Sequence, residues 1–544
     1  MSANLVLTNG RFYTLDPQQP TATAVAIRDG KILAVGIDAD IKALLGSGGE
    51  WVDLNGRCVT PGLVDSHVHF ENFAIFRRRV DLDGANSLEA ALDRLAAYAA
   101  KQLARPHDEN YWLQGRGWQQ DQWGRQAFPT AADLDKINAH VPICLKHKSG
   151  HAAWVNSRAL QIAGINDNTP DTAGGQIQRD SAGHATGILF EDAMELVTDH
   201  IPPETVPEIV DAMRDAQQYC WQVGLTGIHD FDGRSCFLAL QSLHANRELG
   251  LRFVKNIPVK LLENAVGVGL RSGFGDEWLR IGGIKIFADG ALGPRTAAMV
   301  ASYDQEPDNL GIMVTDKEEM QLKASLASAN GLSLTVHAIG DRANHDVLDV
   351  YAQVRAEEKA RADGSHHLRH RIEHVQILHP TDLLRLAELN VIASVQPTHA
   401  TSDMFMVDRY WGERGQYSYA FRTLANSGAT LSFGSDAPIE KIDPLPGIHA
   451  AVTRRRADGS PGEAGWYPEQ KLSVAEAVYA FTMGTAVAGS QEQRFGSITV
   501  GKCADLTIFD QDIFTMPADE LLDVNVAGTI VNGEFKYTFK STIG

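Results

Sequence analysis

The sequence predicts an α/β protein in which a (β/α)8 TIM barrel with insertions is joined to a small composite β-sandwich made from both chain termini. Two patterns predict it. From about residue 59 to 490, apolar runs of four to seven residues alternate with amphipathic stretches, as in a parallel barrel. Near both ends, short β-branched runs are separated by turn pairs such as Asn9-Gly10 and Asn532-Gly533, which is typical of hairpins.

The chain has 544 residues, which is enough for one barrel and a second domain. We expect residues 1–58 and 491–544 to form the sandwich and residues 59–490 to form the barrel. Ser87 can cap a helix over 87–104, which we assign to the barrel pattern. Ser473 and Glu476 form a capping box that predicts a last helix before the sandwich resumes.

Residues from about 107 to 215 form the least regular stretch. Strand-like runs at 112–117 and 142–147 and a hairpin-like run at 174–190 interrupt the barrel pattern, and tryptophans are frequent there. We therefore expect an insertion in this region, part of it barrel and part of it a lid.

The composition excludes several classes of partner. The chain has 49 Lys and Arg against 68 Asp and Glu, a net charge of −19, which disfavours nucleic acid and anionic membranes. Its five cysteines contain no CxxC pair, so neither a disulfide framework nor a thiolate zinc site is indicated. The N-terminus lacks a signal-peptide pattern, and no apolar stretch approaches about 18 residues. We expect a cytoplasmic protein.

Polar residues stand where several apolar runs end. His67 and His69 follow the run at 59–64, and side chains spaced i, i+2 on an extended segment point the same way, so both can bind one metal. His337, His374 and Asp436 end three later runs. The C-terminal ends of barrel strands converge, so these residues are predicted to meet. The step from His374 to Asp436 leaves room for a seventh strand at 391–395.

Lys285 ends another such run, although a protonated ammonium would repel a divalent cation. A lysine desolvated in a barrel has a lowered pKa, and its free amine can capture carbon dioxide. The carbamate could then bridge two metals about 3.5–4 Å apart, an arrangement typical of two-metal hydrolysis. The alternative is a lysine paired with Asp289 beside a single metal.

These motifs together resemble the amidohydrolase superfamily, and more narrowly its YtcJ-like branch, which includes N-substituted formamide deformylase. The resemblance covers almost the entire chain and rests on segments such as LQGRGWQQDQW, IKIFADGALGPRTA, VHAIGDRAN and GSDAPIEKIDP. It implies that His67 and His69 bind one metal with Asp436. It also implies that His337 and His374 bind a second metal and that carboxylated Lys285 bridges the two.

The same resemblance implies a role for Asp436 as the catalytic base. Asp436 would take the proton of a bridging hydroxide as it attacks an amide carbonyl, and would deliver it to the departing nitrogen. Zinc is the default metal for histidine and carboxylate ligands, although iron, manganese or nickel fit similar sites. Helix capping by Asp436 is the alternative interpretation of that residue.

A second group of residues is expected to bind substrate. His399 follows the seventh strand and could hydrogen-bond a carbonyl, and Arg295 could clamp a carboxylate or pair with Asp289. His151 is a third candidate. Tryptophans could shape an apolar pocket, although tryptophans of this kind are more often buried in a core. The tryptophan candidates are Trp118, Trp123 and Trp154.

The leading functional hypothesis is a metal-dependent amidohydrolase that cleaves a small linear amide, with an N-substituted formamide as the model substrate. A deaminase or a cyclic-amide hydrolase on the same scaffold is the first alternative. A catalytically inactive barrel used for assembly is the second, and retention of the six ligand positions argues against it. We expect a small-molecule amide as the partner and a homodimer as the oligomeric state.

Overall fold

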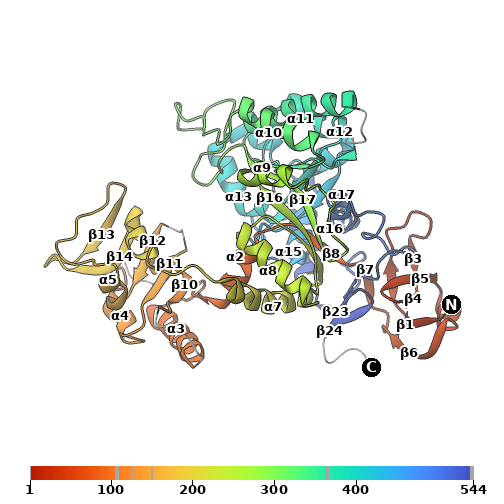
Figure 1. Cartoon of the computed structure of the whole chain (residues 1–544), viewed down its shortest axis with the longest axis horizontal. Helices are drawn as coiled ribbons and strands as arrows, with labels where there is room; N and C mark the ends of the chain where they lie inside the picture. The colour runs from red at the N-terminus through yellow and green to blue at the C-terminus, as the bar shows by residue number, and fades with distance from the viewer. Residues whose placement is uncertain (1, 105–109, 124–126, 149–150, 362–366, 539–544) are drawn as a thin grey trace. The chain divides into compact units, whose positions relative to one another are not determined.

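The computed structural model describes residues 2–104, 110–123, 127–148, 151–361 and 367–538. The chain divides into two compact units: unit 1 comprises Met1–Asn72 and Met213–Gly544, and unit 2 comprises Phe73–Ala212. Unit 1 contains the barrel and the sandwich (Figure 1).

Eight parallel strands form the barrel in sequence order, and each pairs with the next along the chain. The sheet closes where the chain after the last strand meets the first strand. There Val68 bridges Ala437, and the Asp436 amide donates to the His67 carbonyl at 2.7 Å. The predicted (β/α)8 barrel is therefore confirmed. Its strands are β8 (Leu63–Val68), β15 (Leu225–Asp230), β16 (Arg252–Pro258), β17 (Leu279–Phe287), β18 (Leu334–Ala338), β19 (Arg371–His374), β20 (Ile392–Val395) and β21 (Leu431–Phe433).

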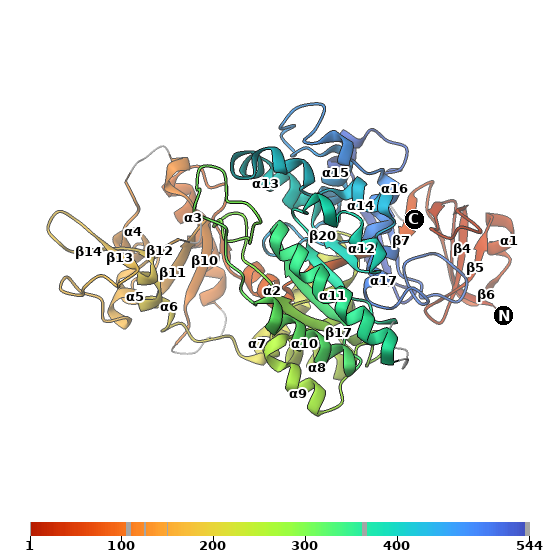
Figure 2. The ribbon, with the colours of Figure 1, turned by 90° about the horizontal axis from the view of Figure 1, so that it is seen from above.

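Helices on the outside of the sheet connect these strands (Figure 2). The capping box of Ser473 and Glu476 opens α16, as the sequence predicted. The helices are α7 (Val206–Gln222), α8 (Arg234–Ala245), α9 (Leu262–Gly267), α10 (Lys317–Ala329), α11 (Asp341–Arg361), α12 (Arg385–Glu388), α13 (Pro397–Tyr410), α14 (Phe421–Ser427), α15 (Pro444–Thr453), α16 (Val474–Phe481) and α17 (Met483–Ala488).

Two sheets built from both chain ends form the sandwich, as the hairpin patterns predicted. Leu7, Val25 and Val59 from the first part of the chain share a core with Ile508 and Ile530 from the last part. One sheet contains β5 (Lys31–Gly36), β4 (Ala24–Arg28), β1 (Ala3–Thr8) and β6 (Leu45–Asp53). The other contains β24 (Glu534–Thr538), β23 (Val526–Val531), β22 (Leu506–Phe509), β7 (Cys58–Pro61), β2 (Arg11–Tyr13) and β3 (Thr21–Ala22); helix α1 is Asp38–Lys42.

The boundary between sandwich and barrel lies within the run expected to be one strand. Cys58–Pro61 is strand β7 and pairs with β22 of the sandwich, whereas the first barrel strand begins at Leu63. Gly62 lies between them, and its amide donates to the Asp505 carbonyl at 2.8 Å. A Cβ at Gly62 would lie 2.3 Å from the Thr226 hydroxyl oxygen, so the chain passes between the two sheets only with glycine there.

A buried ion pair joins the sandwich to the N-terminal ends of the barrel strands. Arg252 begins β16, and its guanidinium donates to both carboxylate oxygens of Asp505, at 2.5 and 2.9 Å. The guanidinium lies 4.6 Å from the ring centroids of both Trp278 and Phe495. Asp505 also accepts from the Asn532 amide at 2.7 Å. The Arg252 guanidinium therefore contacts a carboxylate and two aromatic rings, and the Asp505 carboxylate accepts hydrogen bonds from both Arg252 and Asn532.

Unit 2 has its own sheet and core. It extends from Phe73 to Ala212, whereas the sequence placed the insertion at about 107–215. Helix α3, capped by Ser87 as expected, packs in this unit and not around the barrel, because its apolar face contacts the unit 2 core. The strands are, in sheet order, β13 (Gly175–Arg179), β14 (Ala185–Glu191), β12 (Ala152–Val155), β11 (Ile143–His147), β10 (Leu113–Trp118) and β9 (Val80–Asp81). The helices are α3 (Leu88–Leu103), α4 (Ala131–Asp135), α5 (Ser157–Ile162) and α6 (Glu195–Thr198), and α2 (Phe70–Arg78) leads into the unit.

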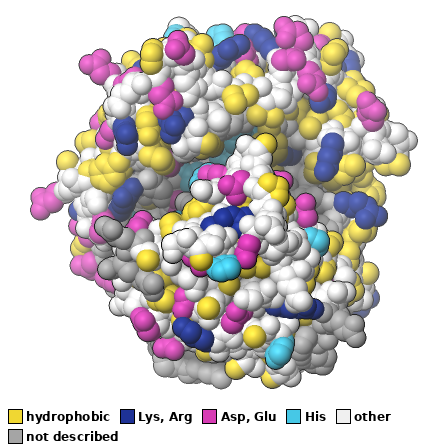
Figure 3. All heavy atoms as spheres, turned by 90° about the vertical axis from the view of Figure 1, so that its left-hand side faces the viewer, with side chains coloured by type: hydrophobic (Ala, Val, Ile, Leu, Met, Phe, Trp, Pro, Cys, Tyr) yellow, Lys and Arg dark blue, Asp and Glu magenta, His cyan; other side chains and the backbone are white. Residues whose placement is uncertain are grey.

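The surface carries charges of both signs. Figure 3 shows acidic and basic side chains interspersed on one face. Within the described ranges, no helix has both the length and the apolar character needed to cross a bilayer. The five cysteines are buried and free of disulfide bonds, as their spacing predicted.

Candidate metal centre

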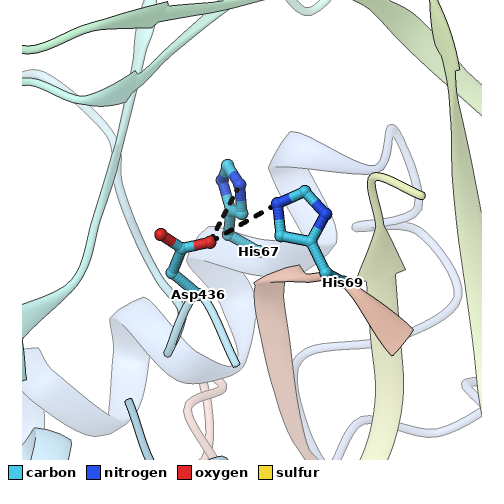
Figure 4. Close-up of side chains that lie close together, drawn as sticks. All are labelled: His67, His69 and Asp436. Carbon is cyan, nitrogen blue, oxygen red and sulfur yellow. Dashed lines mark ion pairs between the residues drawn. The ribbon is translucent and has the colours of Figure 1, made fainter. Parts of the chain in front are cut away.

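Three of the predicted ligands converge at the C-terminal edge of the barrel. His67 lies on β8, His69 follows it, and Asp436 follows β21, so the closure of the barrel brings them together. The Nε2 atoms of His67 and His69 each lie 3.6 Å from Asp436 Oδ1 (Figure 4). This separation is too long for a hydrogen bond. It is close to the distance of about 3.3 Å between two ligands of one tetrahedral zinc ion.

The other predicted ligands lie beside these three. The His374 ring centroid is 5.0 Å from that of His67 and 4.5 Å from that of His337. Lys285 Nζ lies 4.7 Å from the ring centroids of Phe231 and Phe287. All six candidate ligands line one cavity: His67, His69, Lys285, His337, His374 and Asp436.

In three of the candidate histidine ligands, the ring nitrogen that points away from the cavity lies within hydrogen-bond distance of an acceptor. His67 Nδ1 lies 2.7 Å from Glu373, and His69 Nδ1 lies 3.0 Å from Asp232. His374 Nδ1 lies 2.8 Å from Gln396 Oε1. Metal-binding histidines are typically oriented in this way, with the second nitrogen donating to an acceptor. The arrangement directs each Nε2 toward the cavity and fits the binding of a divalent cation.

His337 is oriented differently. Its Nε2 lies 2.9 Å from the Gly290 carbonyl, so Nε2 is the donor and Nδ1 is the nitrogen left for a metal. Asp289, the alternative partner of Lys285, instead accepts from the backbone amides of Ala298, Ile339 and Gly340. Among the described residues Lys285 forms no ion pair. The geometry therefore does not favour the Lys285–Asp289 alternative.

A buried ion pair supports the site from inside the barrel. Arg371 donates to both oxygens of Glu373, at 2.5 and 2.9 Å, and also to the Ser66 carbonyl at 2.7 Å. Burial raises the pKa of Glu373, but the guanidinium of Arg371 outweighs burial and lowers that pKa below its usual value. Glu373 is therefore an ionised acceptor for His67 at neutral pH.

Burial also sets the protonation of most ring nitrogens and of the lysine. It lowers the pKa of His337 to about 3, of His399 to about 4, and of His374 well below its usual value. Neutral imidazole is the form that binds metals. Burial lowers the pKa of Lys285 to about 8 and raises that of Asp436 to about 6. His69 is the exception, because burial lowers its pKa but the hydrogen bond to the charged Asp232 outweighs burial and raises that pKa above the usual value.

Two of the candidate ligands have an unusual backbone conformation. His374 has φ 77° and Asp436 has φ 57°, in the left-handed region that costs a non-glycine residue roughly 1–3 kcal/mol. The Ser435 amide donates to Asp65, which holds the turn in place. Asp436 caps no helix, because the next helix, α15, is capped by Asp443. Such strain is typical of functional sites.

A cavity of about 410 Å³ opens from these ligands. Its walls combine apolar side chains with two further carboxylates, and all of its lining residues belong to unit 1. The apolar side chains are Phe287, Ala291, Leu292, Pro294, Ile339, Met406 and Ile439; the carboxylates are Asp403 and Glu440. A cavity of this size and character can accept a small organic molecule.

His399 lies at this cavity, as predicted, whereas Arg295 and His151 lie elsewhere. His399 is 8% exposed, and its Nε2 lies 4.0 Å from Asp436 Oδ2. Arg295 pairs with Glu306 at 2.5 Å and not with Asp289. The exposed His151 is in unit 2, with Nδ1 2.9 Å from Glu191.

The three tryptophans expected to line a substrate pocket pack instead in the core of unit 2. Trp118, Trp123 and Trp154 are buried in unit 2, and their ring N–H groups donate to the carbonyls of Leu145, Ala85 and Thr130. Side chains that are buried and hydrogen-bonded in this way pack a domain and do not line an open pocket. Their clustering in sequence reflects the core of a separate unit.

Several residues of the site escaped sequence reasoning. Arg371 and Glu373 are spaced i, i+2 on β19, so both side chains point to the same side of the strand, and this spacing was a signal for an inward-facing pair. Asp403 and Met406 follow His399 at helical spacing on α13. No sequence pattern pointed to Asp232, Gln396 or Glu440.

Comparisons with known proteins agree with this geometry. The model of the amidohydrolase family matches residues 50–537. The Arabidopsis thaliana protein LONG AFTER FAR-RED 3 is 34% identical over 98% of this chain and 92% of its own length. The putative amidohydrolase YtcJ of Bacillus subtilis is 33% identical, over 97% of this chain and 98% of its own.

Two further matches carry activities in their names. N-substituted formamide deformylase of Arthrobacter pascens is 27% identical over 98% of both chains. The crystal structure of an uncharacterized metal-dependent hydrolase from Pyrococcus furiosus is 28% identical, covering 94% of this chain and 100% of that chain, with a TM-score of 0.77.

Proposed function

Because this chain belongs to the amidohydrolase family, we propose that it hydrolyses the carbon–nitrogen bond of a small linear amide at a divalent metal centre. One observation carries the proposal: His67, His69 and Asp436 converge beside a cavity of about 410 Å³ at the C-terminal edge of the barrel. Catalytic residues of (β/α)8 enzymes gather at this edge.

The ligands divide into two half-sites in this proposal. His67, His69 and Asp436 would hold one metal, and His337 and His374 would hold the second. Lys285, carboxylated on Nζ, would be the ligand common to both, and its lowered pKa supports this role because a share of free amine is present near neutral pH. Zinc is the default ion for this ligand set. When bound, such ions lower the pKa of water and polarise a carbonyl oxygen.

Asp436 is the proton carrier in this reaction. It accepts a proton from the attacking water as the water oxygen bonds to the amide carbon, and it delivers that proton to nitrogen as the carbon–nitrogen bond breaks. The products are a carboxylic acid and an amine. His399, which lines the same cavity and whose Nε2 lies 4.0 Å from Asp436, donates a hydrogen bond to the substrate carbonyl or to the acid that forms.

An N-substituted formamide is the model substrate. The support is the name of the Arthrobacter pascens relative and the apolar wall of the cavity, which includes Phe287, Ile339 and Met406. Hydrolysis of such a compound releases formate and a primary amine.

The test is metal removal with product analysis. Chelation followed by desalting is expected to abolish formate release from N-substituted formamides, and one to two equivalents of zinc are expected to restore it. Elemental analysis of the purified protein counts the ions. A fully active, metal-free protein would overturn the proposal. Release of ammonia would indicate a deaminase. Ring opening without a separate amine product would indicate a cyclic-amide hydrolase, and inability to bind metal would indicate a catalytically inactive barrel.

Replacement of Lys285 tests the bridge. In Lys285→Ala we expect loss of the bridged pair, with fewer ions per chain and a large loss of activity. Lys502→Ala is a matched control, because this lysine donates to backbone carbonyls in the sandwich region and does not line the cavity. Full activity of Lys285→Ala would rule out the bridge.

A further inference from the structure

One face of helix α13 forms a wall of the cavity beyond the metal ligands. His399, Asp403 and Met406 all line the cavity, at positions i, i+4 and i+7. These positions share one face of a helix, and one turn separates His399 from Asp403 by roughly 6 Å along the axis. The cavity therefore runs along α13 away from Asp436.

Two carboxylates line this part of the cavity: Asp403 lies on α13, and Glu440 lies in the segment that follows β21. Asp403 accepts a hydrogen bond from the Tyr419 hydroxyl at 2.5 Å, and Glu440 accepts one from the Ser402 hydroxyl at 2.6 Å. Burial raises the pKa of Asp403 to about 6, and the charge of Glu440 adds to the rise. Burial also raises the pKa of Glu440. Each carboxylate thus has one neutral donor, and the two repel each other.

Neither carboxylate has a cationic partner within the part of the chain that the structure describes. Arg456 is near enough to lower the pKa of both, but its guanidinium donates to the carbonyls of Thr401 and Ser402. Lys441 is exposed and forms no ion pair with Glu440 in the described residues. Both carboxylates are only partly exposed, and a carboxylate shielded from water without a cation is costly unless a ligand supplies one.

His399 is a further polar side chain of the same cavity without a hydrogen-bond partner among the described residues, and it lies beside His374 and Asp436. It is 8% exposed, and neither of its ring nitrogens has a hydrogen-bond partner. Its Nε2 faces Asp436 Oδ2 at 4.0 Å. An unpartnered buried imidazole of this kind lacks a donor or acceptor that a bound molecule would provide.

We propose that the cavity selects amides that carry a second, positively charged amine, with the ammonium bound between Asp403 and Glu440. The amide carbonyl then lies beside His399 and Asp436, and a short alkyl spacer lies against Phe287, Ile339 and Met406. Asp403 and Glu440 are specificity-determining residues. This assignment rests on the proposed amide hydrolysis for its reacting end, and on the two carboxylates for its other end.

Two formamides of equal length provide the test. N-(4-aminobutyl)formamide carries an ammonium where N-pentylformamide carries a methyl group. For the zinc-loaded enzyme we expect kcat/KM to favour the charged compound by about tenfold or more, because a hydrogen-bonded ion pair replaces an unpaired, partly buried charge. Equal rates, or a preference for N-pentylformamide, would overturn the assignment.

Isosteric variants locate the preference. Asp403→Asn and Glu440→Gln remove charge but keep an oxygen that accepts from Tyr419 and Ser402. Each is expected to reduce the preference severalfold, and the double variant is expected to abolish it. Glu413→Gln removes one exposed charge just after α13, outside the cavity, and should leave the ratio unchanged. A double variant that keeps the wild-type ratio would contradict the assignment.

Calorimetry separates this proposal from the proposed reaction. Isothermal titration of the zinc-loaded Asp436→Asn variant, which lacks the proton carrier, with the same two formamides reports binding with little turnover. Tighter binding of the charged compound, together with no hydrolysis of either compound by the wild-type enzyme, would support the ammonium site and contradict the hydrolase. Hydrolysis without any charge preference in kcat/KM or in binding would support the hydrolase and overturn the ammonium site.

Discussion

The two ends of the barrel differ in whether their shielded charges are paired. At the N-terminal end, Arg252 and Asp505 form a two-point ion pair, and both are enclosed by the sandwich. At the C-terminal end, Asp436 has no hydrogen-bonded cation, and its nearest imidazole nitrogens lie 3.6 Å away. The first end uses charge to join two domains, and the second leaves charge available to a ligand.

From this difference we expect the N-terminal end of the barrel to contribute to the stability of the fold and the C-terminal end to reduce it. Breaking a buried ion pair by removing one partner strongly destabilises a protein. A shielded charge without a partner lowers the stability of the folded state until a ligand binds. Strained backbone at His374 and Asp436 lies at the same C-terminal end. Variants at the two ends should therefore separate activity from stability.

The largest effect is expected at Asp436. Asp436→Asn removes the proton carrier, and kcat/KM should fall by about 10²–10⁴-fold. Asparagine tolerates the positive φ of this position, so the fold should persist. Steady-state kinetics and thermal unfolding measure both properties. A variant with normal activity, or one destabilised as strongly as Arg252→Met, would break the comparison.

Arg252→Met tests the opposite end. It leaves Asp505 buried without its cation, and the free energy of unfolding should fall by about 3–5 kcal/mol. Activity per folded molecule should stay close to that of the wild type. Urea titration gives the stability, and the double variant Arg252→Met with Asp505→Leu should recover much of the loss. If the double variant is no more stable than Arg252→Met, unpaired charge is not the cause.

Asp232→Asn tests the acceptor behind His69 and should have an intermediate effect. Asp232 contacts His69 Nδ1 at 3.0 Å and accepts from the Asn72 side chain at 2.7 Å, so it orients the imidazole. We expect metal affinity to fall about 10–100-fold, with activity restored at saturating zinc. Competition with a chelator measures the affinity. An unchanged affinity would show that Asp232 does not position the ligand.

The smallest effect is expected at the capping box of α16. The side chain of Arg422, which donates to Glu476 at 2.5 and 2.7 Å, lowers the pKa of Glu476 to about 2. A pKa lowered on folding stabilises the folded state above the usual value of 4.5 and loses that contribution as pH falls toward 2. The side chain is 39% exposed, so solvent screening reduces the gain to about 0.5 kcal/mol.

Thermal unfolding of Glu476→Gln against wild type at a series of pH values checks this sign. The difference between the two proteins should be present at pH 7 and shrink as the pH falls below 4.5. A difference that grows on acidification would contradict the assigned direction.

Sequence reasoning identified the residues that end barrel strands. His67, His337, His374 and Lys285 lie at or near the C-terminal ends of β8, β18, β19 and β17, because the strand pattern is local and visible along the chain. Apolar runs of four to seven residues are enough to reveal such strands. The capping box at Ser473 was predicted for the same reason.

Local pattern did not identify residues whose role depends on distant partners. Trp118 has the same local appearance in a pocket as in a core, and only the packing of unit 2 assigned it to the core. Glu373 supports His67 across 306 residues of sequence. Asp403 lies on α13 and Glu440 lies in the segment after β21, and only the folded barrel brings both to one cavity.

The sequence by itself indicated the barrel, the composite sandwich and the candidate ligands, because hydrophobic periodicity and turn residues act over a few residues at a time. Only the tertiary structure decided which charges are paired and which face the cavity. Partners for a buried charge come from whichever elements the fold brings within hydrogen-bond distance. That is why Arg252 joins two domains, whereas Asp403 and Glu440 are left for a ligand.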